Sequence, residues 1–286
     1  MDKYYKKVPQ DQVQQLMRFR QEHPPKRLER EGITWEYLTA GNSSGMPLLL
    51  LPGALSSADS AWRTINLLSG GKYNLICPNY PPEVGSMSAL ADGIATILEQ
   101  EGIRSTYVVG GSYGGMLAQV FTHRHPDKVD KLVLSHTYPP VEKRAVSVEP
   151  AIRLFKLLPL GMLKRMLRSR MTGILPLDPT PELLLVSAQI HEAVDTRLTR
   201  QAALNTYRRM MDFDRSKFTP ADLASWQGKT LIMLAEDDPT TPEKLRKALL
   251  ALYPGAKLHL FRGSGHATAI LESDEYIKVI EEFLEE

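Results

Sequence analysis

The stretch that decides the fold is a short apolar run followed by a cluster of glycines around one serine. It reads Tyr107-Val108-Val109-Gly110-Gly111-Ser112-Tyr113-Gly114-Gly115-Met116. The apolar run predicts a strand. The residues that follow place Leu117, Val120 and Phe121 at the spacing of one helix face. The stretch is therefore predicted to be a strand-to-helix turn with Ser112 at its centre.

A serine at the tip of such a turn has a strained backbone, at a cost of roughly 1–3 kcal/mol. The positions two before and two after it carry almost no side chain, because strand and helix approach closely. Gly110 and Gly114 meet this need, and Gly111 and Gly115 relax the turn further. The G-x-S-x-G pattern is typical of a nucleophile elbow, which brings a serine hydroxyl near the N–H groups that begin a helix. A glycine-rich joint with an incidental serine is the alternative, and the downstream sequence decides between the two.

The composition excludes several classes of protein. The chain has 286 residues, of which 24% are charged and 43% hydrophobic, as in ordinary soluble globular proteins. A net charge of +2 gives no argument for nucleic-acid binding. The single cysteine, Cys77, excludes an intramolecular disulfide and a cysteine metal cluster. Residues 1–7 are polar and do not resemble a secretory signal, and no apolar run is long enough to span a membrane, so we expect a cytoplasmic protein.

Strand and helix patterns alternate along most of the chain. Strands are predicted at 47–51, 73–78, 107–109, 129–135, 230–234 and 257–261, after a hairpin at 26–39. Helices are predicted at 9–22, 86–101, 241–253 and 273–284. This alternation indicates an α/β fold with a mostly parallel central sheet and helices on both of its faces.

The alternation stops between residues 139 and 220. This segment has helical patterns without a clear strand, and prolines such as Pro150 and Pro159 are expected to cut it into short pieces. We therefore predict a core domain from residues 1–138 and 221–286, with a helical cap inserted at 139–220. The first part of the cap alternates basic and large apolar residues. We favour a cap whose apolar face covers a pocket; the alternative is a weak peripheral contact with a membrane surface.

A serine nucleophile needs a base, and the base needs an acid that orients it. The strand at 230–234 leads into Ala235-Glu236-Asp237-Asp238-Pro239, and the strand at 257–261 leads into Arg262-Gly263-Ser264-Gly265-His266. Both segments follow the carboxyl ends of strands, where open α/β sheets form their sites. The residues alone leave all three acidic side chains as candidates, beside the alternative of a solvated turn.

On these three motifs, in this order, the chain resembles the α/β-hydrolase superfamily over almost its whole length. The resemblance implies that Ser112 is the nucleophile and His266 the base. It implies that Asp238 is the acid, since the acid of the family usually stands three residues after a small residue, here Ala235. It further implies an oxyanion hole made by the backbone N–H groups of Tyr113 and Ala54.

The implied activity is hydrolysis of a carboxylic ester or related acyl compound through an acyl-enzyme. The expected partner is a small acyl substrate, with no metal, organic cofactor or nucleic acid. His136 follows the strand at 132–134, where it could face the pocket, but we expect a structural role for it.

Two departures from the family pattern suggest another function. Pro52-Gly53 stands where many relatives have His-Gly, and Asn79-Tyr80-Pro81-Pro82 stands where they have an Asp-x-x-Gly turn. The chain is similar to maspardin-like proteins in three short pieces: Leu51-Pro52 followed by Ser56-Ser57-Ala58-Asp59, Tyr80-Pro81 in place of the usual turn, and Phe19-Arg20 ahead of Pro24-Pro25-Lys26. That similarity implies the alternative of a non-catalytic binding or adaptor protein with a vestigial hydrolase pocket.

Overall fold

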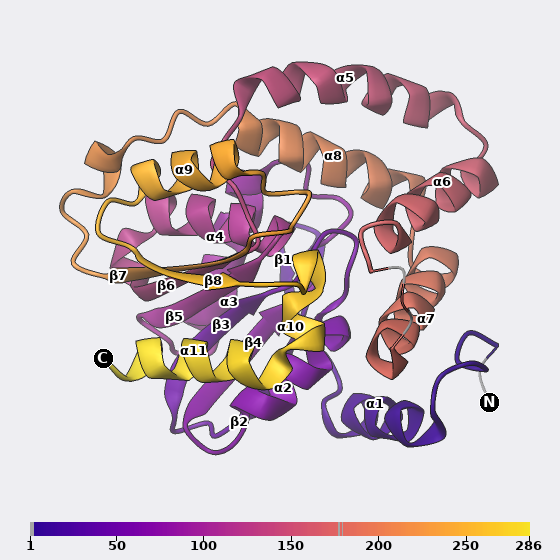
Figure 1. Cartoon of the computed structure of the whole chain (residues 1–286), viewed down its shortest axis with the longest axis horizontal. Helices are drawn as coiled ribbons and strands as arrows, with labels where there is room; N and C mark the ends of the chain where they lie inside the picture. Colours follow the sequence, from indigo (N-terminus) through magenta and orange to yellow (C-terminus); the bar gives the residue numbers. More distant parts are fainter. Residues whose placement is uncertain (1–2, 177, 179) are drawn as a thin grey trace.

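The computed structural model of the protein describes residues 3–176, 178 and 180–286; Met1 and Asp2, at the polar start of the chain, lie outside this range. An eight-stranded sheet forms the centre, in the order β1-β2-β4-β3-β5-β6-β7-β8 (Figure 1). β2 pairs antiparallel with β1 and β4, and the remaining neighbours are parallel. The predicted mostly parallel α/β fold is confirmed. The strands are β1 (Lys26–Arg30), β2 (Ile33–Gly41), β3 (Met46–Leu51), β4 (Tyr73–Pro78), β5 (Thr106–Gly111), β6 (Val129–Ser135), β7 (Lys229–Ala235) and β8 (Lys257–Phe261).

Helices cover both faces of this sheet, as expected. One face packs against α3 (Met87–Gln100), α4 (Tyr113–Arg124) and α9 (Glu243–Leu252). The other packs against α1 (Gln10–Glu22), α2 (Trp62–Leu68) and α11 (Ser273–Glu285).

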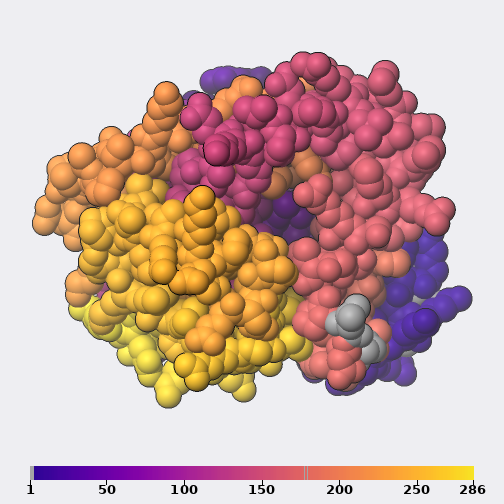
Figure 2. Space-filling view, turned by 45° about the horizontal axis from the view of Figure 1, so that its top comes forward, coloured from indigo at the N-terminus to yellow at the C-terminus, as the bar shows by residue number. Residues whose placement is uncertain are grey.

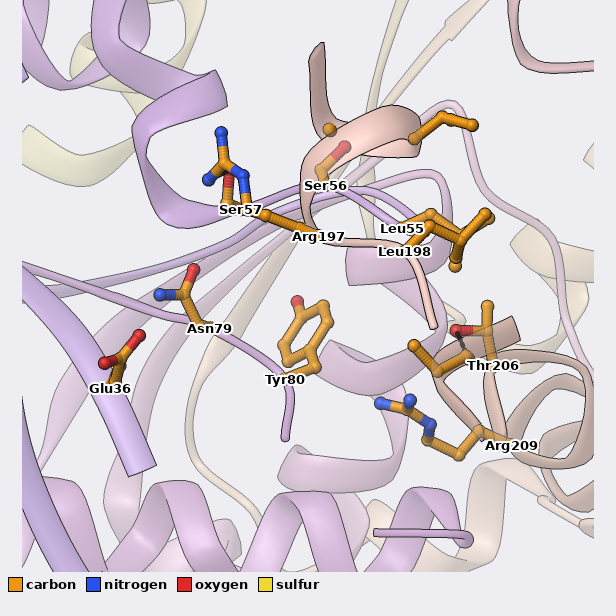
Figure 3. Close-up of a pocket in the computed structure, with 13 residues that line it drawn as sticks. Glu36, Leu55, Ser56, Ser57, Asn79, Tyr80, Arg197, Leu198, Thr206 and Arg209 are labelled. Carbon is orange, nitrogen blue, oxygen red and sulfur yellow. Dashed lines mark hydrogen bonds between the residues drawn. The ribbon is translucent and has the colours of Figure 1, made fainter. Parts of the chain in front are cut away.

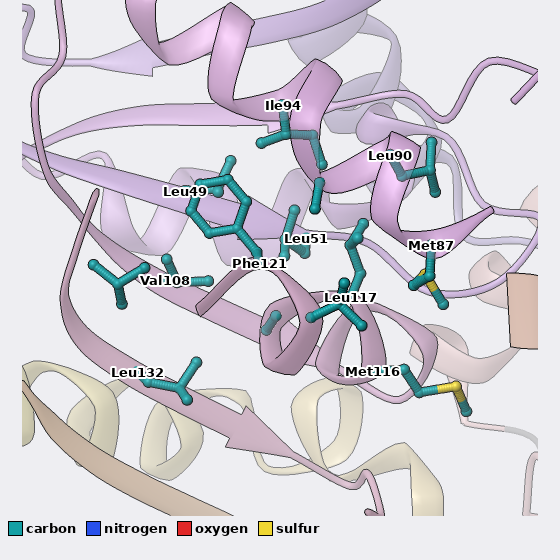
Figure 4. Packing of buried hydrophobic residues seen from close by; sticks show 14 of the residues in the cluster. Leu49, Leu51, Met87, Leu90, Ile94, Val108, Met116, Leu117, Phe121 and Leu132 are labelled. Carbon is teal, nitrogen blue, oxygen red and sulfur yellow. The ribbon is translucent and has the colours of Figure 1, made fainter. Parts of the chain in front are cut away.

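The unbroken apolar run of β3 serves both cores, because successive side chains of a strand point to opposite faces. Leu49 and Leu51 pack with α3 and α4, while Leu48 and Leu50 pack on the other face (Figure 4).

Residues 139–220, which we call the helical insertion, contain four α-helices and, among the residues the structure describes, no strand. They are α5 (Glu142–Leu157), α6 (Leu160–Thr172), α7 (Pro181–Thr196) and α8 (Arg200–Asp214). The insertion has an apolar cluster of its own, in which the Phe155 and Tyr207 rings meet edge to face 4.8 Å apart. In Figure 2 it forms the rose part of the visible face, with a hollow between it and the C-terminal part.

Pro150 does not interrupt the insertion as expected, because α5 runs through it. A proline removes one helical hydrogen bond, to the carbonyl four residues earlier. Here that carbonyl belongs to Val146, and Val146 and Pro150 are both exposed. Water can therefore satisfy the carbonyl, and the cost of the missing bond is small enough for the helix to continue.

Ion pairs with little solvent exposure hold the insertion together and attach it to the sheet domain. Arg144 Nη2 lies 2.6 Å from Oδ1 of the buried Asp214, which ties the two ends of the insertion together. Arg20 of α1 reaches Glu192 of α7 at 2.6 Å and Asp59 of the core at 2.7 Å. Such pairs fix orientation more than they add stability, since desolvation offsets most of the attraction.

Candidate active site

Ser112 stands alone in the turn between β5 and α4. Its backbone has φ 52° and ψ −117°, a region that residues other than glycine rarely adopt. The Ser112 N–H donates to the Ser135 carbonyl at 2.8 Å, and its own carbonyl accepts the Thr137 hydroxyl at 2.9 Å. These contacts from β6 and the loop after it hold the strained turn in place.

Two glycines let the helix approach the sheet here. A Cβ at Gly110 would lie 2.4 Å from the Gly114 carbonyl oxygen, and a Cβ at Gly114 would lie 2.0 Å from the Leu51 carbonyl oxygen. Both distances are far inside van der Waals contact, so the expected steric role of these positions is confirmed. Gly115 is equally constrained, at 2.6 Å from Thr137 Cβ. A Cβ at Gly111 would meet nothing within 4 Å, so close packing does not require a glycine there.

The fold brings the three predicted side chains together. His266 lies in the short 3-10 turn Gly265–Ala267 after β8, and Asp238 lies in the turn after β7. His266 Nε2 is 3.1 Å from Ser112 Oγ, and His266 Nδ1 is 2.8 Å from Asp238 Oδ2. The imidazole therefore bridges a hydroxyl and a carboxylate that are far apart in the chain. His266 is 154 positions from Ser112 and 28 from Asp238, so the two partners are 126 positions apart.

Asp238 is buried, and its carboxylate has hydrogen-bond partners on both oxygens. Oδ1 accepts the Thr240 amide and hydroxyl, each at 2.8 Å, while Oδ2 faces His266. Burial raises the pKa of Asp238, but the hydrogen bonds and charge of His266, together with Thr240, outweigh it and lower the pKa to about 2. Sequence reasoning missed Thr240. A hydroxyl residue two positions after an aspartate, the spacing of an Asx turn, is the signal for it.

The two neighbouring acids have other partners. Asp237 Oδ1 accepts the amides of Gly263 and Gly265, each at 3.2 Å, and so fixes the loop before the histidine. Glu236 pairs with Arg262 at 3.4 Å on the surface. The geometry thus gives the three acids different partners, and only Asp238, the acid that the resemblance implies, faces the histidine.

His136 lies behind His266 and has the structural position expected of it. Its ring nitrogens lie 2.8 Å from Ser135 Oγ and from Thr268 Oγ1, which joins β6 to α10 (Thr268–Leu271). The ring meets that of His266 edge to face at 5.9 Å. Burial, and then the charge of His266, lower the pKa of His136 to about 4.

One predicted oxyanion donor, Tyr113, follows the serine directly, and the other, Ala54, lies in a loop that contacts the elbow. Tyr113 is the first residue of α4, so its N–H has no acceptor within the helix. Ala54 lies in the loop after β3, and this loop touches the elbow where the Leu51 and Pro52 carbonyls meet Gly114.

The residues that depart from the family pattern hold this same loop. Asn79 Oδ1 accepts the Ala58 amide at 2.7 Å, and the Tyr80 hydroxyl donates to the Pro52 carbonyl at 2.9 Å. Leu55, the residue after Ala54, has φ 57° and is strained like the serine. The loop therefore has its own supports in place of the usual histidine contacts.

Two pockets flank the Ala54 loop. One, of about 200 Å³, includes Gly53 of that loop and Gly111 of the elbow in its wall. The other, of about 300 Å³, includes Leu55 and Tyr80 (Figure 3). Its remaining wall comes largely from α7, α8 and the turn between them: Ala193, Val194, Arg197, Leu198, Ala202, Thr206 and Arg209.

Comparison with known proteins identifies the family. A profile described as the alpha/beta hydrolase family matches residues 48–279. The chain belongs to the alpha/beta hydrolase family. Proline iminopeptidase of Lactobacillus helveticus is 22% identical, over 88% of this chain and 94% of its own. Maspardin of Macaca fascicularis is 24% identical, over 84% of this chain and 76% of its own. This match confirms the resemblance to maspardin-like proteins that the sequence indicated.

A solved structure shares the fold of this member of the family. The enol-lactonase of Burkholderia xenovorans LB400 superposes with a TM-score of 0.75 at 15% identity, covering 91% of this chain and all of that one (100%). In the residues described by the structure, no helix is long and apolar enough to cross a membrane.

Proposed function

We propose that the protein is a serine hydrolase that cleaves a carboxylic ester or a related acyl compound through Ser112, His266 and Asp238. The observation that supports this most strongly is the imidazole of His266, within hydrogen-bond distance of both partners at 3.1 and 2.8 Å. This is the arrangement of nucleophile, base and orienting acid. A buried carboxylate with a pKa of about 2 stays ionised and stabilises the imidazolium that forms during reaction.

In this mechanism His266 Nε2 takes the proton of Ser112 as its oxygen attacks the substrate carbonyl. The amides of Tyr113 and Ala54 stabilise the oxyanion, and loss of one such donor typically costs roughly 2.7–4 kcal/mol. The protonated His266 then gives its proton to the leaving alcohol, and the acyl group remains on Ser112. A water, deprotonated by His266, releases the acid and restores the serine.

We also propose that the helical insertion acts as a cap domain over a core of residues 1–138 and 221–286. Support comes from the 300 Å³ pocket, whose wall combines the core residues Leu55 and Tyr80 with α7 and α8. Such a cap would determine which acyl group reaches the serine. A cytoplasmic location remains a prediction.

Reaction with a fluorophosphonate probe tests the proposal. We expect the wild type to be labelled, Ser112→Ala not to be labelled, and His266→Ala to be labelled far more slowly. Ser43→Ala, at an exposed position in the turn between β2 and β3, is the matched control and should be labelled like the wild type. A folded wild type that resists the probe would contradict the proposal and favour a maspardin-like adaptor.

The bond that is cleaved needs a separate assay, because one named relative is an iminopeptidase. We expect turnover of p-nitrophenyl acyl esters of graded chain length, and none of proline p-nitroanilide. Cleavage of the anilide alone would replace the ester with an amide substrate on the same triad.

A further inference from the structure

Arg209 of α8 is a buried arginine that forms no ion pair with the residues the structure describes. Its side chain is 2% exposed, and its Nη1 has no hydrogen bond among the residues that the structure describes. The Nε atom donates to the Asn205 carbonyl at 3.0 Å. In the described part of the chain no carboxylate forms an ion pair with it. An unpaired buried cation is costly, so its presence calls for a ligand.

Arg197, in the wall of the same pocket, shows the contrast. Its guanidinium lies 3.0 Å from Asp59 Oδ1 and 3.7 Å from Glu192 Oε2, so protein carboxylates neutralise it. Arg208 is adjacent in sequence and donates to the side-chain oxygen of Asn205 at 2.8 Å. Arg209 alone of these three is aimed at the pocket without a counter-charge.

The wall of this pocket does not include Ser112 or His266, but two of its residues, Leu55 and Tyr80, adjoin the proposed catalytic centre. Figure 3 shows the Arg209 guanidinium pointing towards Tyr80, with Leu55 across the cavity. Leu55 follows Ala54, and the Tyr80 ring lies 5.5 Å from that of Tyr113, the residue after the serine. The buried Tyr113 hydroxyl faces the Arg209 guanidinium, although no pair of their atoms meets strict hydrogen-bond geometry. Burial raises the pKa of Tyr113 to about 12, while the charge of Arg209 and its hydrogen bonding lower it, so this hydroxyl is protonated at neutral pH.

We propose that Arg209 binds an anionic group at the far end of the acyl chain, so that the substrate is an ester of an acid that carries a second carboxylate. This rests on the proposed serine-hydrolase function. A guanidinium fork matches a carboxylate or a phosphate with two parallel hydrogen bonds, and the Tyr113 hydroxyl can add a third. A cavity of about 300 Å³ suits a short chain with such an end group.

Binding is measured first, because it does not depend on turnover. Calorimetry uses Ser112→Ala protein with glutarate, propyl phosphate and the neutral glutaramide. We expect glutarate to bind at least about tenfold more tightly than glutaramide, and Arg209→Met to remove that difference. Propyl phosphate binding better than glutarate would overturn the carboxylate assignment. Equal affinity for all three probes would overturn the anion site.

Turnover is measured second, as the ratio of kcat/KM for p-nitrophenyl hemiglutarate to that for p-nitrophenyl valerate. We expect the ratio to fall about tenfold or more in Arg209→Met and to recover in part in Arg209→Lys. Arg208→Gln should leave it unchanged. If the wild type cleaves neither ester, the proposed function fails while calorimetry still tests the site. If it cleaves both without preference, the inference fails alone. If Arg209→Met does not fold, Arg209→Lys, which retains the charge, replaces it as the test variant.

A second inference rests on the outer surface of α5 and α6. Leu157 is 83% exposed and Val146 68% exposed, and Leu154, Met162 and Met166 are also exposed. Positions 146 and 157 share one helix face, opposite Ile152 and Phe155, which pack inward. A cluster of large exposed apolar side chains marks an interaction surface.

The charges beside this surface indicate its partner. Lys143, Lys156 and Arg165 are exposed on the same helices and form no ion pair within the described residues. Exposed apolar side chains and unpaired cations on the same helices complement an anionic lipid surface. We infer that this face docks the protein peripherally on an anionic bilayer.

Flotation with phosphatidylcholine vesicles, with and without phosphatidylserine, tests this inference. We expect the wild type to float only with phosphatidylserine and to be released by high salt. The double variant Val146→Gln, Leu157→Gln should stay unbound, whereas Met46→Gln, exposed on β3 at the other end of the sheet domain, should float like the wild type. Absence of flotation, or a stable dimer that the double variant abolishes, would overturn the inference.

Discussion

Replacing Asp238 by Asn tests the role of the carboxylate without changing its shape. Asn Oδ1 can still accept both Thr240 hydrogen bonds, at the 2.8 Å found for Asp238. The amide NH₂ would then take the place of Oδ2, 2.8 Å from His266 Nδ1. Because an NH₂ group only donates, Nδ1 has to accept, and the imidazole proton moves to Nε2. In that tautomer Nε2 faces Ser112 as a donor and cannot take its proton.

The expected loss is about 10⁴-fold in kcat, or roughly 5 kcal/mol of transition-state stabilisation. Stability should change as well. An Asp238 pKa of about 2 against the usual 3.8 contributes about 2 kcal/mol to folding above pH 4, and this is lost as the pH falls towards 2. The difference in unfolding free energy between the wild type and Asp238→Asn should therefore be largest at neutral pH and shrink in acid.

The assay is hydrolysis of p-nitrophenyl butyrate, with urea unfolding at several pH values. Asp237→Asn is the matched control, because an Asn oxygen can still accept the Gly263 and Gly265 amides. We expect less than about a threefold loss from it. An Asp238→Asn enzyme that keeps most of its activity, with Asp237→Asn inactive, would refute the assignment of the acid.

Three further outcomes are expected. Gly114→Ala should lower activity by at least about 100-fold, because a Cβ 2.0 Å from the Leu51 carbonyl displaces the Ala54 loop; kinetics and thermal unfolding measure it. His136→Gln should flatten the pH dependence of stability. The pKa of His136 is about 4 in the folded protein against the usual 6.5, so the unfolded state takes up the proton more readily. Wild-type His136 therefore does not affect the free energy of unfolding above pH 6.5 and lowers it by up to about 3 kcal/mol as the pH falls to 4, which urea unfolding measures. Phe155→Ala should destabilise the insertion by about 3–5 kcal/mol, because the Phe155 side chain is only 3% exposed and packs against the Tyr207 ring. The rate of amide hydrogen exchange should increase first in the helices of the insertion.

The sheet could be predicted because its signals are local. An unbroken apolar run such as Leu48–Leu51 predicts a buried parallel strand, and the glycines around the serine predict the elbow. Chain order then placed the histidine and the acidic turn at the carboxyl edge of the sheet.

Other features depend on contacts between distant segments. The residues alone do not distinguish the three consecutive acids, and only the family resemblance favours Asp238; the partners of each side chain after β7 depend on the folded structure. Pro150 continues a helix because its missing hydrogen bond faces water, which no local pattern reveals. The unpaired charge of Arg209 is visible only when α8 is packed against Tyr80 and Tyr113, far earlier in the chain.

The claim on which the account depends is that Ser112 carries the acyl group during turnover. Acid quenching of a reaction with p-nitrophenyl butyrate, followed by peptide mass spectrometry, tests it most directly. We predict one butyryl group on the peptide that contains Ser112. The acylated fraction of this peptide at steady state should be greater in heavy water, which slows deacylation, than in ordinary water. Product release with the acyl group on another nucleophile, such as the thiol of Cys77, or on none, would contradict the account.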